Sequence, residues 1–90
     1  MEIKHCCIEI YKLLEVVNEN HWIKEFEFFM SELEYSETKD LLRKLLKIYG
    51  GMDSFNDLVL YKNGMLCSYE NERLDNLRKE LYQILITQLY

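Results

Sequence analysis

The sequence predicts a single, mainly α-helical domain of about four helices with one short β-hairpin. Apolar residues recur at spacings of three and four along most of the chain, which is the period of a helix with one buried face. One segment instead surrounds Asn63-Gly64, the dipeptide favoured in a two-residue hairpin turn. The chain has 90 residues, 49% of them hydrophobic, and no proline, which fits one domain spanning 1–90. We expect helices over 2–18, 21–34, 37–49 and 71–89, and strands over 58–62 and 65–69.

The first two predicted helices form an antiparallel pair, because only a short connection separates them. Asn20 is expected to cap the second helix. The apolar stripe of the first helix is Ile3, Cys6, Cys7, Ile10, Leu13, Leu14 and Val17. That of the second is Trp22, Ile23, Phe26, Phe29, Met30 and Leu33.

Ser36 is expected to cap the third helix, in which Asp40 would pair with Lys44 one turn later. Gly50 stands where a helix end favours a residue with positive φ. The apolar residues of this helix are Leu41, Leu42, Leu45, Leu46 and Tyr49. Its basic residues Lys39, Arg43 and Lys47 repeat every four residues, a pattern more typical of a solvated helix face than of a phosphate site in an acidic chain.

The hairpin register follows from its turn, since Lys62 opposite Met65 places Leu60 opposite Cys67 and Leu58 opposite Tyr69. We expect the face shared by Leu58, Leu60, Met65, Cys67 and Tyr69 to rest on helices, because an isolated two-stranded ribbon is only marginally stable. The last helix would bury Leu74, Leu77, Leu81, Ile84, Leu85 and Leu89. Its charged residues Glu72, Asp75, Arg78, Lys79 and Glu80 fall off that stripe.

The least generic stretch of the chain is GGMDSFND, from Gly50 to Asp57. Two glycines let the backbone reverse, and Ser54 and Asp57 have the spacing of a capping box around a short turn. Phe55 is available to fill the core. The stretch lacks the glycine spacing of a nucleotide-binding loop, so we interpret it as a structural motif. Its members are Gly50, Gly51, Ser54, Phe55, Asn56 and Asp57.

Catalytic and metal chemistry find little support in the sequence. His5, Cys6 and Cys7 are adjacent, and neighbouring residues on a helix diverge by about 100°, whereas zinc ligands are spaced to converge on one ion. His5 and His21 have no catalytic context. We therefore predict no enzyme activity, no cofactor and no metal site; an enzyme would remain an option only if zinc were found.

Composition also limits the compartment and the partners. The net charge of −5 argues against nucleic-acid binding, which needs surplus Lys and Arg. The N-terminal residues MEIKHCCIEIYKLLEVV are broken by charges, which predicts no signal peptide, no membrane contact and a cytoplasmic location. An odd count of three cysteines is typical of reduced, partly buried thiols.

The acidic charge is concentrated in one part of the chain. Residues 15–40 contain eight acidic and two basic residues, a net charge of −6. Either this is an ordinary solvated helix face or it is a docking face, because such a field speeds association with a basic protein. The candidate partner-binding residues lie around the turn between the second and third helices, where an exposed Tyr35 would serve as an anchor. They are Glu25, Glu32, Glu34, Tyr35, Glu37 and Asp40.

The stretch LKIYGGMDSFNDLVLYKNG, followed by Glu-Asn-Glu-Arg-Leu at 70–74, resembles a family of small bacterial proteins with a Gly-Gly-Met-Gly-Ser-Phe-Asn-Asp motif. The resemblance covers about the C-terminal half, and this chain has Asp53 where the pattern has Gly. Such proteins are similar to the immunity proteins of polymorphic toxin and contact-dependent growth inhibition systems. The resemblance implies an inhibitor of a bacterial toxin.

Two functions follow as expectations. The first is an immunity protein, a monomer or weak dimer, that binds the C-terminal toxin domain of a cognate protein, most simply a basic nuclease, and covers its active site or substrate groove. The alternative is a helical interaction module or homo-oligomeric regulator, for example a phage-encoded inhibitor of host defence. It is favoured by more aromatic residues than one helical face can bury, namely Trp22, Phe26, Phe28, Phe29, Tyr82 and Tyr90.

Overall fold

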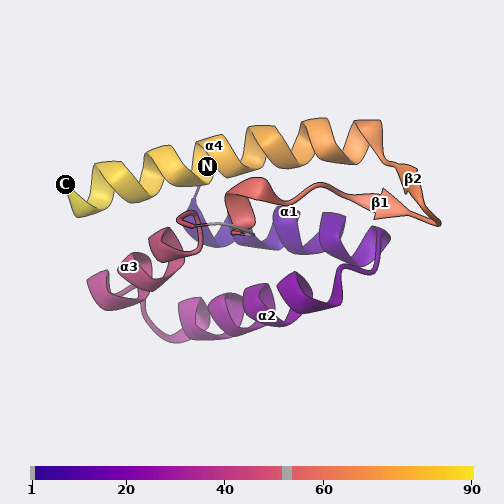
Figure 1. The fold of residues 1–90 in the computed structure, drawn as a ribbon. Coiled ribbons are helices and arrows are strands. Elements are labelled where there is room, and N and C mark those ends of the chain that lie inside the picture. The colour runs from indigo at the N-terminus through magenta and orange to yellow at the C-terminus, as the bar shows by residue number, and fades with distance from the viewer. Residues whose placement is uncertain (1, 52–53) are drawn as a thin grey trace.

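A computed structural model describes residues 2–51 and 54–90 and confirms the mainly α fold with one hairpin (Figure 1). The helices begin and end within about three residues of the predicted bounds. In chain order the elements are α1 (Ile3–Val16), α2 (Asn20–Tyr35), α3 (Lys39–Lys47), the 3-10 turn η1 (Phe55–Asp57), β1 (Tyr61–Lys62), β2 (Met65–Leu66) and α4 (Ser68–Leu89).

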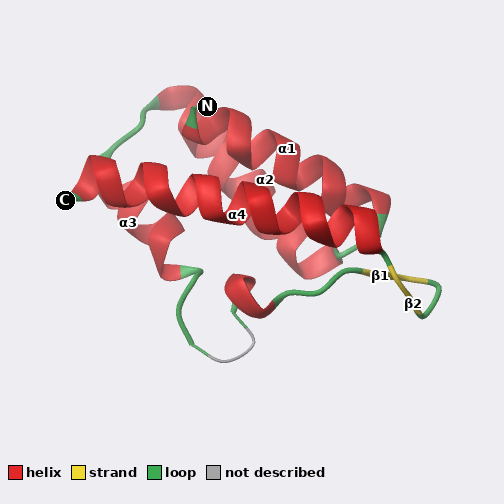
Figure 2. Cartoon of the chain, turned by 90° about the horizontal axis from the view of Figure 1, so that it is seen from above, coloured by secondary structure: helices red, strands yellow, loops and turns green. Residues whose placement is uncertain are grey.

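The helices form two packed layers around one core. α1 runs antiparallel to α2, as predicted, and it also packs antiparallel against α4, while α3 packs against α4 (Figures 1 and 2). The segment that carries η1 returns along the helices to the hairpin, which projects at one end of the molecule (Figure 2). The fold therefore leaves the outer sides of α1 and α2 and the whole hairpin facing outward.

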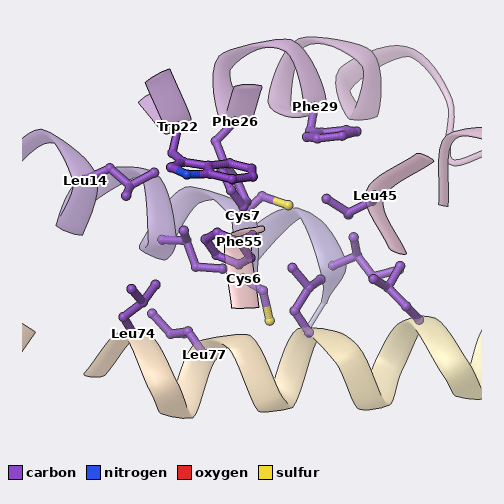
Figure 3. Close-up of a cluster of buried hydrophobic side chains, with 14 of the residues drawn as sticks. Cys6, Cys7, Leu14, Trp22, Phe26, Phe29, Leu45, Phe55, Leu74 and Leu77 are labelled. Atoms are coloured by element: carbon purple, nitrogen blue, oxygen red, sulfur yellow. The ribbon is translucent and has the colours of Figure 1, made fainter. Parts of the chain in front are cut away.

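Phe55 lies at the centre of the core, as its place in the motif predicted. The side chain is fully buried, and its ring centroid lies 5.0 Å from that of Phe26, 5.2 Å from Trp22 and 5.6 Å from Tyr49. Figure 3 shows Phe55 between the aromatic residues of α2 and the leucines of α4. The predicted stripes supply the other buried apolar side chains: Ile3, Cys6, Cys7, Ile10, Leu14, Val17, Phe29, Leu41, Leu42, Leu45, Leu60, Leu74, Leu77, Leu81 and Leu85.

The helix caps differ from the sequence prediction in two places. Ser36 follows the end of α2, and Thr38 caps α3, where its Oγ1 accepts from the backbone N–H of Leu41 at 3.2 Å. Asn20 is the first residue of α2 rather than its cap, which is Glu19. Ser36 and Thr38 are both good capping residues, so composition alone does not choose between them, whereas Glu19 holds the N-cap position of α2 without a side-chain cap bond.

The hairpin turn is as predicted, but the ribbon is shorter. Asn63 and Gly64 have φ of 53° and 78°, and Lys62 pairs with Met65. The predicted pairing of Leu58 with Tyr69 is wrong, because α4 begins at Ser68. Only two residues on each side form strands, in place of 58–62 and 65–69.

The side chain of Asn71 ends the ribbon. Its Oδ1 accepts from the N–H of Leu60 at 2.7 Å, and its Nδ2 donates to the carbonyls of Leu60 at 2.9 Å and Cys67 at 2.8 Å. The amide thus provides Leu60 with the bonds that a strand partner would supply. Leu60 is buried, and Leu58 and Cys67 pack against the core, but Met65 and Tyr69 remain 73% and 74% exposed, so the expected apolar face of the ribbon rests on the helices only in part.

Candidate functional site

One side of α2 carries alternating acidic and aromatic side chains. Glu25, Phe28, Glu32 and Tyr35 follow at spacings of three and four residues, which places them along one side of the helix. Phe28 is 45% exposed and Tyr35 is 84% exposed. We call these four residues the α2 stripe. Aromatic anchors beside charged groups are typical of protein-binding surfaces.

The acidic residues at the end of α2 oppose the helix dipole. Glu32 and Glu34 lie in its last turn, where the helix carries partial negative charge, and that turn contains no basic residue. An acidic side chain in such a position costs about 0.3–1 kcal/mol. Glu34 is compensated by its ion pair with Lys4, whereas the described residues show no compensating contact for Glu32, and such a broken local rule is typical of a functional position.

The structure does not gather the six predicted partner-binding residues into one surface. Glu34 lies on the side of α2 that faces α1, and its carboxylate is 2.6 Å from the Lys4 ammonium. Asp40 pairs with Arg43 at 3.1 Å instead of the predicted Lys44. Glu37 lies in the connection between α2 and α3 and borders a shallow depression with Ile84 and Gln88.

Glu25, Glu32 and Tyr35 therefore remain together, and Phe28 joins them. Phe28 was predicted from sequence only as surplus aromatic content. Its position three residues after Glu25 and four before Glu32 was the signal that could have placed it in the surface.

The GGMDSFND motif is fixed by Arg78 of α4. Arg78 is only 8% exposed, and its Nη1 donates to the carbonyls of Phe55 at 2.8 Å and Leu58 at 2.9 Å. Its Nη2 pairs with the carboxylate of Asp75, and its guanidinium carbon lies 5.7 Å from the Phe55 ring centroid. Arg78 was predicted to fall off the buried stripe of α4, but the structure buries it. The buried cation anchors the motif to α4.

The rest of the motif departs from the predicted turn. Positive φ occurs at Gly51, with 89°, rather than at Gly50. Ser54 does not form a capping box with Asp57; its hydroxyl donates to the Tyr49 carbonyl at 3.3 Å. Asn56 and Asp57 are exposed, and Met52 and Asp53, including the departure from Gly, lie outside the described residues.

Two thiols in the core are chemically protected. Cys6 and Cys7 are fully buried, and burial raises the pKa of both; the Cys7 value rises to about 12, with the neighbouring Cys6 adding to the effect. Cys67, on the connection before α4, is half-buried. Within residues 2–51 and 54–90, no three His, Cys, Asp or Glu side chains are grouped to hold a metal ion. No helix in these two ranges is long and apolar enough to cross a bilayer.

The fold defines a small helical domain, and the α2 stripe lies on its outer surface. The chain belongs to the family described as Domain of unknown function (DUF6966), whose model matches residues 15–68. That range includes all of α2 and the motif, and it ends at the first residue of α4. Neither the curated proteins nor the solved structures contain a match to the chain.

Replacing Arg78 should destabilise the fold more than replacing its neighbour. Arg78→Met keeps the apolar stem but removes the side-chain donor to the Leu58 carbonyl, one of the two donors to the Phe55 carbonyl, and the cation that pairs with Asp75. We therefore expect a loss of about 2–4 kcal/mol in the free energy of unfolding. Lys79→Met, at an exposed position, is the matched control and should change stability by less than about 0.5 kcal/mol. Urea unfolding measures both; equal losses would contradict the anchoring role.

The raised pKa of Cys7 predicts a loss of stability in alkaline solution. Its thiol ionises near the ordinary value of 9.0 in the unfolded chain but only near 12 in the folded one. Above pH 9 the unfolded state therefore binds fewer protons, and stability falls as pH rises. Between pH 8 and pH 10, the free energy of unfolding of Cys7→Val should fall by about 1 kcal/mol less than that of the wild type. The control Cys67→Val should lose as much stability as the wild type. Parallel slopes for all three proteins in urea unfolding would contradict the prediction.

Proposed function

We propose that this chain is an immunity protein that binds the toxin domain of a cognate bacterial protein through the α2 stripe. The supporting observation is that stripe: Phe28 and Tyr35 are exposed and alternate with Glu25 and Glu32, and Glu32 lies where it weakens its own helix. A stable core that presents one acidic, aromatic surface is what an inhibitor of a basic protein requires. In this proposal the chain is not an enzyme and acts in the cytoplasm.

A nuclease is the toxin class that such a surface fits best. Enzymes that hold nucleic acid line their groove with Lys and Arg, because these neutralise phosphates. Carboxylates on α2 would occupy the same groove as phosphate mimics and speed the encounter, while the aromatic side chains would supply buried contact. The resemblance of the motif region to small bacterial immunity proteins is a second reason for the proposal.

Reversing the charge of Glu32 should stabilise the fold but weaken binding to the toxin. Glu32→Lys removes an acid from the C-terminal turn of α2 and adds a cation, so we expect the free energy of unfolding to rise by about 0.5–1 kcal/mol. The association rate with the toxin domain should fall by about three- to tenfold at low salt and converge with the wild type at high salt. Stopped-flow mixing with the toxin domain encoded beside this gene, where one is present, measures the rate.

Glu72→Lys is the matched control, because it makes the same charge change at an exposed position of α4. It should slow association by less than twofold. If both variants slow association equally, the effect belongs to net charge and not to the α2 stripe. If neither does at any salt concentration, electrostatic docking by α2 is wrong.

A second candidate, a homo-oligomeric regulator or interaction module, is supported by the hairpin. Exposed apolar side chains surround the ribbon, a concentration that is unusual in a monomer. They are Val59, Tyr61, Met65, Leu66 and Tyr69, with exposures from 46% to 74%. The surplus aromatics named from sequence support it less, because Trp22, Phe26 and Phe29 are buried.

Sedimentation distinguishes this candidate from the first. A homo-oligomeric regulator would sediment above its monomer mass of 11.0 kDa, and Met65→Glu would raise its dissociation constant by about tenfold or more, because it places a charge in the apolar contact. Tyr90→Glu, at a side chain 90% exposed beyond the other end of α4, should leave the constant unchanged. A stable homo-oligomer would remain assembled at about 100 μM, whereas an association with a millimolar dissociation constant would be mostly dissociated at that concentration. A wild-type chain that is monomeric at about 100 μM therefore contradicts a stable homo-oligomer.

A further inference from the structure

A groove runs between α1 and α2 on the side away from α4. It has a volume of about 750 Å³ and is lined by residues of both helices at helical spacing. From α1 these are Lys4, Ile8, Tyr11, Lys12 and Glu15, and from α2 Glu27, Met30, Ser31 and Glu34. The stretch from Lys4 to Glu15 spans about 16 Å, the length of roughly three turns of helix.

The floor of the groove is apolar. Ile8, Tyr11 and Met30 are only partly buried, although each lies next to the core stripe of its helix. Two antiparallel helices leave between them a furrow in which a third helix packs by ridges and grooves. The opposite side of α1 is already covered by α4. The furrow is therefore a second place on α1 where a helix could pack, and no element of the described chain covers it.

One end of the groove carries two acidic side chains without a cationic partner. Glu15 and Glu27 line the groove together with Tyr11, and burial together with these two carboxylates raises the pKa of the Tyr11 hydroxyl. In the described part of the chain neither carboxylate forms an ion pair, whereas Lys4 pairs with Glu34 and Lys12 with Glu9 at 3.0 Å. Glu15 also lies in the last turn of α1, where the helix dipole disfavours an acid and no basic residue compensates.

We propose that this groove binds a basic amphipathic helix of a partner protein. Apolar side chains of that helix would pack on Ile8, Tyr11 and Met30, and an Arg or Lys would pair with Glu15 and Glu27. The charge complementarity at this end selects the occupant, because a cation there would pair with the two carboxylates and offset the unfavourable position of Glu15 at the end of α1. The inference rests on the proposed function only in taking the partner to be basic.

A second copy of this chain fits the groove poorly. Its clustered exposed cations Lys39, Arg43 and Lys47 lie on α3, whose leucines Leu41, Leu42 and Leu45 are buried. α3 therefore has exposed cations but no exposed apolar face that could pack in the groove. The apolar hairpin, in turn, is not a helix and presents few cations.

The probe is a synthetic amphipathic helix of about three to four turns, with leucines at helical spacing and arginines beside them. A matched peptide carries glutamate in place of each arginine. Titration of the isotope-labelled chain should move backbone amide signals on the facing sides of α1 and α2 with the arginine peptide. The glutamate peptide should bind at least tenfold more weakly.

Two variants test the charge contacts. Glu15→Gln/Glu27→Gln should weaken binding of the arginine peptide by about three- to tenfold, within the range of two exposed ion pairs. Glu70→Gln/Glu72→Gln makes the same change on α4, outside both the groove and the α2 stripe, and should change affinity by less than twofold. Circular dichroism confirms that both variants remain folded.

Several outcomes would overturn the inference. They are no binding at millimolar peptide, equal binding of both peptides, signal changes at the hairpin or the α2 stripe instead of the groove, or saturation of the groove by a second copy. Because no toxin is present, failure here leaves the proposed function standing. Conversely, if Glu32→Lys does not change the association rate with the toxin domain, the result of the peptide titration still stands.

Discussion

The rest of the structure depends on the contact between the guanidinium of Arg78 and the backbone around Phe55. Filling the core with Phe55 brings its loop backbone inside, where unpaired carbonyls are costly. Arg78 donates to the carbonyls of Phe55 and Leu58 and is itself neutralised by Asp75. A loop is thereby held in the position that another helix would occupy, and α2 and α4 pack on either side of it (Figure 3).

This contact also determines which sides of the helices remain free. Trp22 and Phe26 turn toward Phe55, which fixes the rotation of α2 about its axis. Helical spacing then places the α2 stripe on one flank of the buried side and the groove residues Glu27 and Glu34 on the other. The surface charges are therefore positioned by an aromatic contact in the core, although none of them touches it.

The sequence predicts whatever depends on local periodicity. Helix positions, the buried stripes and the Asn63-Gly64 turn follow from spacing and from turn chemistry. Arg78 and Asn71 could not be placed, because their long-range partners are backbone groups 11 to 23 residues away, and a backbone group leaves no trace in residue type. For the same reason the early start of α4, which shortens the hairpin, was missed. The acidic region was visible as composition, but its division into two flanks of α2 depends on tertiary packing.

The two flanks of α2 limit the shape of any partner that uses both. Glu32 and Glu34 are two residues apart and so about 200° apart around the helix, which means that no flat surface contacts both. A partner that engages the stripe and the groove together must wrap the exposed edge of α2, with one segment beside Tyr35 and another lying along α1. Such a partner would approach through a concave basic groove flanked by a helix, so the geometry of α2 favours a partner with a cleft over one with a flat face.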